Sequence, residues 1–141
     1  MAVALAACGS GSTTSATNAG GGRAAFVAAA NRICRQESRE LARDPIKSTA
    51  EILSNGPKQI ATEQAAVAHL TALKPPTGLR TDWHALLTGF GQATADYRRL
   101  VADVRSHHYR AAQTTSTAGH TAVLRAHAAA ARNGISDCSK V

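Results

Sequence analysis

The side chains with the strongest intrinsic chemistry in this chain are three cysteines and six histidines. His107 and His108 are adjacent, so on a helix their side chains would point about 100° apart and would not share an ion. His120 and His127 share a helix face, but they stand two turns apart, whereas helical zinc ligands are spaced at i and i+4. We interpret the histidines as solvated or capping residues, and we predict no metal site and no cofactor.

No arrangement of residues indicates a nucleophilic or an acid–base catalyst. Serine and threonine are frequent, but none occupies the Gly-x-Ser-x-Gly motif that exposes a nucleophilic serine. The nine carboxylates include no close pair with a matching base, and Gly20, Gly21 and Gly22 belong to a linker and not to a phosphate-binding loop. We therefore predict that the protein is not an enzyme.

One acidic residue stands among apolar ones. Glu37 lies on the apolar face of the first predicted helix, and Gln64 lies near the apolar stripe of the second. A buried carboxylate there would form either a site or a hydrogen bond that specifies the fold. Because charged residues are almost never fully buried, we expect Glu37 to face water where the bundle opens.

The cysteine nearest the beginning of the sequence lies in a sorting motif. The segment Leu5-Ala6-Ala7-Cys8 resembles a bacterial lipobox, in which an aliphatic residue and two small ones precede a cysteine. The resemblance implies lipidation of the Cys8 thiol and cleavage before it, with the thiolate as the nucleophile that takes the lipid. Residues 8–22 are rich in Gly, Ser and Thr, which is typical of a flexible linker.

The residues before Cys8 are too few for a complete signal peptide. Such a peptide has a basic start and an apolar stretch of about 7–15 residues, whereas residues 1–7 contain no Lys or Arg. We expect the signal to begin upstream, with residues 1–7 as its remnant. The alternative is a chance cysteine in a flexible tail.

Cys34 and Cys138 remain once Cys8 is assigned to the lipid, and they stand at opposite ends of the predicted domain, residues 23–141. An even number of remaining cysteines in an exported chain favours a disulfide. Two free thiols are the alternative. Metal binding is disfavoured, because no second Cys or His lies at ligand spacing from either residue.

The charge balance favours anionic partners. The formal net charge is +7, which suits anionic lipid, cell-wall polymer or nucleic acid, and export disfavours nucleic acid. One face of the first helix carries four arginines: Arg32, Arg35, Arg39 and Arg43. Near an anionic surface each would contribute about 1 kcal/mol, while the alternative is an ordinary solvated face. No apolar run reaches the roughly 18–20 residues that span a bilayer, so the predicted membrane contact is the lipid anchor.

Composition and local stop signals predict an all-α fold. Alanine is abundant, aromatic residues make up only 4% of the chain, and strand-like alternation is nearly lacking. The first helix is predicted over residues 23–42, ended by Asp44-Pro45. Ser48 and Glu51 form a capping box for a short helix over residues 49–53.

Two long helices and a final one complete the predicted up-down four-helix bundle. Asn55-Gly56 is interpreted as a turn, with Pro57 opening a helix that reaches Leu73. The next helix carries a heptad seam: Leu79, Trp83, Leu86, Phe90, Ala93, Tyr97, Leu100 and Val104. We expect this seam to form a filled core. The last helix, predicted over 109–133, follows a turn at residues 106–108. Its inner face is rich in alanine and includes Gly119, so it should approach its neighbours closely, and Gly134 suits the position after its end.

Several short motifs, in this order, resemble those of small secreted or lipid-anchored helical proteins of actinobacteria. They are Asn31-Arg32-Ile33-Cys34, Leu70-Thr71-Ala72-Leu73-Lys74-Pro75-Pro76, Leu79 with Trp83, and Gly134-Ile135-Ser136-Asp137-Cys138. The resemblance implies a helical bundle with a disulfide between Cys34 and Cys138, and it implies no activity. It also implies a Gly-Asp-like turn where this chain has His107-His108.

These observations favour an exported, membrane-anchored lipoprotein on the outer face of the cell membrane, acting as a non-enzymatic interaction or accessory module with an unidentified protein partner. A small-molecule carrier with a pocket between helices, around Trp83, Phe90 and Tyr97, is the alternative. An enzyme is a third hypothesis. A cavity lined by those aromatic residues would favour the carrier, and a polar cluster in a cleft would favour the enzyme.

The anchor prediction is tested by replacing Cys8. With an intact upstream signal, the protein should partition into detergent, because acyl chains on the thiol hold it in the membrane. The Cys8→Ala variant should be released or remain unprocessed. Unchanged detergent partitioning of the variant would contradict lipidation at Cys8.

Overall fold

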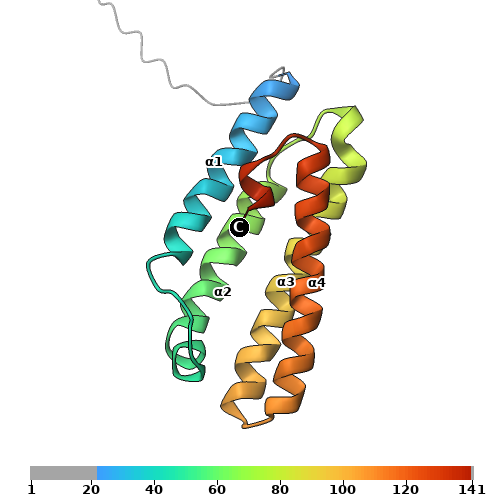
Figure 1. The fold of residues 1–141 in the computed structure, drawn as a ribbon. Helices are drawn as coiled ribbons and strands as arrows, with labels where there is room; N and C mark the ends of the chain where they lie inside the picture. Colours follow the sequence, from blue (N-terminus) through green and yellow to red (C-terminus); the bar gives the residue numbers. More distant parts are fainter. Residues whose placement is uncertain (1–21, 141) are drawn as a thin grey trace, which may run out of the picture.

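The computed structural model describes residues 22–140, and the predicted lipobox at Leu5–Cys8 and most of the linker lie outside it. Four helices run alternately up and down (Figure 1): α1 (Arg23–Leu41), α2 (Thr49–Thr71), α3 (Arg80–Arg105) and α4 (Tyr109–Arg132). Two short 3-10 turns, η1 (Thr77–Leu79) and η2 (Asp137–Ser139), precede α3 and follow α4. The described residues contain no strand, so the predicted all-α, four-helix bundle is confirmed.

The local signals at most helix ends are confirmed. At the start of α2, Ser48 Oγ accepts a hydrogen bond from the Glu51 amide at 3.2 Å, and Glu51 Oε2 accepts one from the Lys47 amide at 2.6 Å. Gly134 follows α4 with a φ of 73°, the left-handed conformation that glycine adopts without strain. His107 has a φ of 59° in the α3–α4 turn, so a histidine occupies a position that favours glycine.

The predicted turn at Asn55-Gly56 is wrong. The helix that begins after Ser48 continues through Gly56 and Pro57, so the two predicted helices are one. Gly56 is buried, and a Cβ atom on it would lie 2.8 Å from Val101 Cγ2. The glycine therefore allows α2 to approach α3 closely. Asn55-Gly56, a pair typical of turns, here lies within a helix because the missing side chain of Gly56 makes room for Val101.

A large cluster of buried hydrophobic residues lies at one end of the bundle, where the C-terminal segment folds back onto α1. Phe26 and Trp83 pack edge to face there, with ring centroids 4.8 Å apart. Asn31 Oδ1 accepts a hydrogen bond from the Asp137 amide at 2.9 Å. The buried residues of this cluster are Phe26, Ala30, Cys34, Leu70, Leu79, Trp83, Leu86, Ala129, Ala130, Ile135 and Cys138.

A disulfide between Cys34 and Cys138 holds this end together, as predicted. It joins α1 to η2 across 104 positions of sequence, with a Cα–Cα distance of 5.1 Å. In the chain-entropy account a loop of that length contributes about 4–5 kcal/mol of stability. That contribution is comparable to the whole free energy of unfolding of a small domain.

The helices are unevenly packed against one another. α3 and α4 form the closest pair, since a Cβ atom on Gly89 of α3 would lie 2.9 Å from both the Ala122 carbonyl oxygen and Ala126 Cβ. In residues 22–140 the α1 backbone comes within 8 Å, Cα to Cα, only of α2 and η2, although its Phe26 side chain reaches Trp83 of α3. The side between α1 and α4 is therefore closed at the disulfide end, where Ala30 and Ala130 belong to the same core cluster, and it is open toward the middle, where residues of both helices border a hollow.

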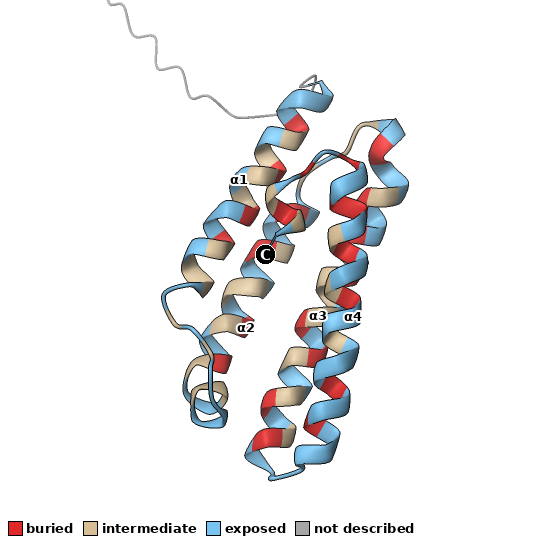
Figure 2. Cartoon of the chain, in the orientation of Figure 1, coloured by how far each residue is buried: buried red, intermediate tan, exposed pale blue. Residues whose placement is uncertain are grey.

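The expectation of a filled heptad seam is wrong in its middle. Trp83, Leu86 and Val104 are buried, but the four seam positions between them are only half-buried: Phe90, Ala93, Tyr97 and Leu100. Figure 2 shows buried positions along the facing sides of α3 and α4, and on α1 no residue beyond Glu37 is buried. The half-buried stretch coincides with the open side, because α1 is too far from α4 to cover it.

Candidate functional site

A hollow lies in the middle of the bundle, between all four helices. Its volume is about 220 Å³. The lining residues are Glu37 and Leu41 of α1, Glu63 and Val67 of α2, Phe90, Ala93 and Thr94 of α3, and Val123 of α4. The walls are thus mainly apolar, and two carboxyl groups from different helices face the same space.

Two further hollows adjoin this central hollow. One, of about 300 Å³ between α2, α3 and α4, shares Glu63, Ala93 and Val123 with it. The other, of about 330 Å³ between α1 and α2, shares Glu37 with it. A ligand in the central hollow could therefore extend in either direction along the open side of the bundle.

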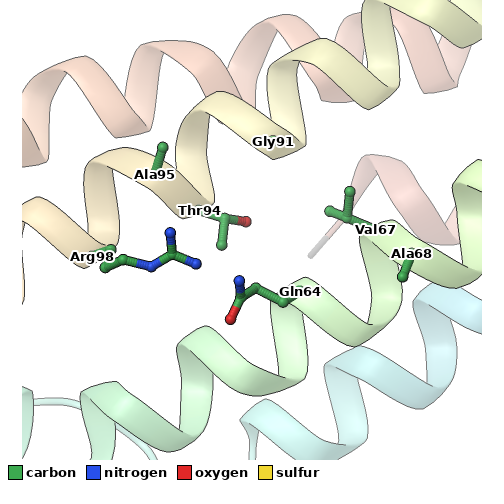
Figure 3. A pocket seen from close by; sticks show the side chains of 7 residues that line it. All are labelled: Gln64, Val67, Ala68, Gly91, Thr94, Ala95 and Arg98. Carbon is green, nitrogen blue, oxygen red and sulfur yellow. The ribbon is translucent and has the colours of Figure 1, made fainter.

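A fourth hollow, of about 280 Å³, lies outside this set, between α2 and α3. In Figure 3 the Arg98 guanidinium group and the Gln64 amide face one another across it, while the Thr94 hydroxyl is turned away and donates to the Phe90 carbonyl oxygen at 2.9 Å. Gln64 and Arg98 are exposed, so this hollow is a depression in the surface. Val67 and Thr94 line both it and the central hollow and form the wall between them.

Glu37 is mostly buried, and its carboxyl group faces the hollows that open between the helices. Only 8% of the residue is exposed, and in residues 22–140 its carboxyl group has no hydrogen-bond or ion-pair partner. Burial, followed by the negative charges of Glu63 and Glu40, raises the pKa of Glu37 to about 8.

Glu63 and Tyr97 continue the polar lining from α2 and α3. Burial raises the pKa of Glu63, and a hydrogen bond with the Thr94 side chain opposes that rise. The Tyr97 hydroxyl donates to Gln59 Oε1 at 3.2 Å, and burial together with the charge of Glu63 raises its pKa to about 12. The interior is thus acidic, although the chain as a whole is basic.

Asp96 is a further acidic residue in this region. It is 4% exposed, lines the hollow between α2, α3 and α4, and accepts a hydrogen bond from Gln92 Nε2 at 3.1 Å. Its Cβ would lie 3.3 Å from a Cβ atom placed on Gly119. The predicted close approach of α4 at Gly119 is thereby confirmed, and the approach is what covers Asp96.

The arginine face lies away from the hollow. Arg32, Arg35, Arg39 and Arg43 are all exposed, and Arg35 pairs with Asp137 at 2.6 Å. An exposed pair of this kind contributes little to stability. Three arginines of the face thus remain for contact with an anionic surface, which stays a prediction.

The histidines are dispersed. His107 Nδ1 and the Tyr109 hydroxyl lie 2.9 Å apart in the α3–α4 turn, and the His127 ring packs edge to face on Phe90 at 6.1 Å between centroids. His120 lies at the edge of the hollow between α2, α3 and α4. Among residues 22–140, no group of three or more His, Cys, Asp or Glu side chains is arranged to hold a metal ion.

The apolar stripe of α2 also predicts that Glu63 faces the interior, although the stripe was described only by its apolar residues. Ile60 and Val67 are seven positions apart, and a helix face with that period includes the position between them, Glu63. Glu37 occupies the equivalent gap between Ile33 and Leu41 on α1. Asp96 gave no such signal, because its burial depends on α4 approaching α3 at Gly119.

Comparison with known proteins adds no family to these observations. No protein-family model, curated protein or solved structure matches the chain. In the described part of the chain, none of the helices combines the length and the apolar character that a bilayer crossing requires. The function is therefore inferred from the geometry of the bundle and from the residues that precede it.

The buried carboxyl of Glu37 makes a prediction about stability. Its pKa of about 8 in the fold lies above the ordinary value of 4.5, so between those pH values the unfolded chain binds fewer protons than the native state. Stability should therefore fall as the pH rises through this window, by at most about 1.4 kcal/mol per pH unit for one group. Denaturant unfolding at several pH values should show a shallower fall for Glu37→Gln than for the wild type.

The matched control is Asp44→Asn, which removes one carboxylate charge from the α1–α2 connection. It should leave the pH dependence of the wild type in place, because Asp44 is partly exposed and pairs with Lys58 at 3.5 Å. Identical slopes for the wild type and Glu37→Gln would show that Glu37 titrates as an ordinary exposed residue.

Proposed function

We propose that the protein is a non-enzymatic, lipid-anchored envelope protein whose helical domain binds a small, largely apolar ligand in the central hollow. The observation that carries the proposal is this hollow, lined by all four helices on the open side of the bundle. The proposal joins two predictions from the sequence: the location of a lipoprotein and, as the alternative function, a small-molecule carrier.

The apolar walls supply the driving force for binding. Leu41, Val67, Phe90 and Val123 are half-buried around the hollow, and a ligand that covers them removes their remaining apolar surface from water. Small-molecule sites usually occupy about 300–1,000 Å³. The central hollow reaches that range only together with the hollows that share its lining residues, so an elongated ligand suits it best.

The sequence before the bundle supports the location. Leu5-Ala6-Ala7-Cys8 and the following linker would tether the domain at the outer face of the membrane. The exposed arginines of α1 would then lie near anionic lipid or cell-wall polymer. An interaction module that acts through this arginine face is the second candidate, and it does not require an occupied hollow.

A substitution that fills the hollow tests the proposal. Ala93 lines both the central hollow and the neighbouring one between α2, α3 and α4, so Ala93→Leu should occupy ligand space. N-phenyl-1-naphthylamine, a neutral fluorophore that brightens in apolar surroundings, should bind the wild type. Ala93→Leu should weaken its binding by about tenfold or more, since a displaced ring loses several apolar contacts.

The matched control is Ala102→Leu, the same change on the same helix at an exposed position away from the hollows. It should bind the fluorophore as the wild type does. Ala93→Leu should also be at least as stable as the wild type, because it fills empty space. No binding by the wild type, or equal binding by Ala93→Leu, would exclude the central hollow as a ligand site and favour the interaction module.

A further inference from the structure

We infer that the ligand of the central hollow is an organic cation, an ammonium group on an elongated apolar body, and that the ammonium group pairs with the Glu37 carboxylate. This inference rests on the proposed function, since it names the chemical class of the ligand for the same hollow. It follows from the position of one side chain and from the charges around it.

Glu37 provides the first observation. More than nine-tenths of the residue is buried, and it faces both the central hollow and the hollow between α1 and α2. No described residue donates a hydrogen bond to its carboxyl group or forms an ion pair with it. Its oxygens are not among the fully buried atoms that lack a partner, so they still reach water in the hollow. A ligand that displaces this water must supply a partner for the carboxyl group, because a buried acid without one is destabilising.

The charges around Glu37 provide the second observation. The charged residues that α1 and α2 place near it are Glu40 and Glu63, and His69 lines the hollow between these helices. The α3 and α4 residues that line the central hollow carry no charge. Among these lining residues there is no Lys or Arg, and Arg98 lies on the other side of the wall formed by Val67 and Thr94.

These charges discriminate between classes of ligand. An anionic ligand would place a like charge beside Glu37 and Glu63, which is unfavourable in a partly desolvated site. A neutral apolar ligand would displace water from Glu37 and leave its carboxyl group without a partner. A cation with an apolar body satisfies both the carboxylate and the walls formed by Leu41, Phe90 and Val123.

Proton release accompanies this binding. The pKa of Glu37 is about 8, so near neutral pH the carboxyl group is largely protonated in the empty hollow. An ammonium group pairs with the ionised form, and binding therefore releases a proton. The affinity for the cation should rise between about pH 6 and pH 8, whereas the affinity for a neutral analogue of the same shape should change less.

A pair of probes of nearly equal size separates charge from apolar binding. The probes are n-octylammonium and 1-octanol, whose affinities are measured by titration calorimetry with the folded domain at pH 6 and pH 8. The wild type should bind octylammonium about tenfold or more tightly than octanol at pH 8, because charge-assisted hydrogen bonds to a carboxylate are stronger than neutral ones. This preference should shrink at pH 6, and the proton release should appear as a dependence of the measured heat on the buffer.

The Glu37→Gln variant should lose the preference for octylammonium, its pH dependence and the proton release, while it still binds octanol. Asp44→Asn, which removes a carboxylate away from the hollow, should behave as the wild type. Equal affinities of the wild type for the two probes, or an unchanged preference in Glu37→Gln, would overturn the assignment of an organic cation and leave the hollow as an apolar site. Failure of the wild type to bind either probe would overturn both this inference and the proposed function.

Discussion

The bond between Cys34 and Cys138 fixes the arrangement on which the rest of the structure depends. α1 approaches α2 and η2 but not α4, so its position against the α3–α4 pair is set largely at the disulfide end. There the C-terminal segment returns over α1, the Asp137 amide donates to Asn31, and Ile135 is fully buried. A covalent clamp at one end allows the other parts of α1 to stand away from α4 without detaching from the bundle.

The hollow in the middle follows from this one-sided clamp and from the size of the side chains. α4 contributes mostly alanine to the interior, which lets it lie against α3 at Gly89 but leaves little volume to extend toward α1. Phe90 and Val123 then border empty space. Glu37 lies in that space because it is one turn beyond Cys34 on the same face of α1, and its burial is stabilised by no partner within residues 22–140.

Local signals in the sequence predicted the helices well and the interior poorly. Capping residues, prolines and the glycine after α4 act within a few residues of themselves, so the ends of α1, α3 and α4 could be predicted. Gly56 was misinterpreted because a glycine that admits a neighbouring helix has the same sequence pattern as one in a turn. The exposure of Glu37 and Glu63 depends on how the four helices pack around the hollow, and no pattern within one helix specifies that packing. The disulfide was predictable because assigning Cys8 to a lipid leaves two cysteines in a chain expected to be exported, but the hollow beside it was not predictable.

The central claim is that the disulfide holds α1 on a bundle that is otherwise open between α1 and α4. Amide hydrogen exchange in a Cys34→Ala/Cys138→Ala variant tests it most directly, because exchange reports opening helix by helix. We expect the amides of α1 and of residues 135–140 to lose much of their protection, while α3 and α4, paired closely along their length, retain theirs. If α1 in the variant remained as protected as in the wild type, packing alone would hold it and the account would be contradicted.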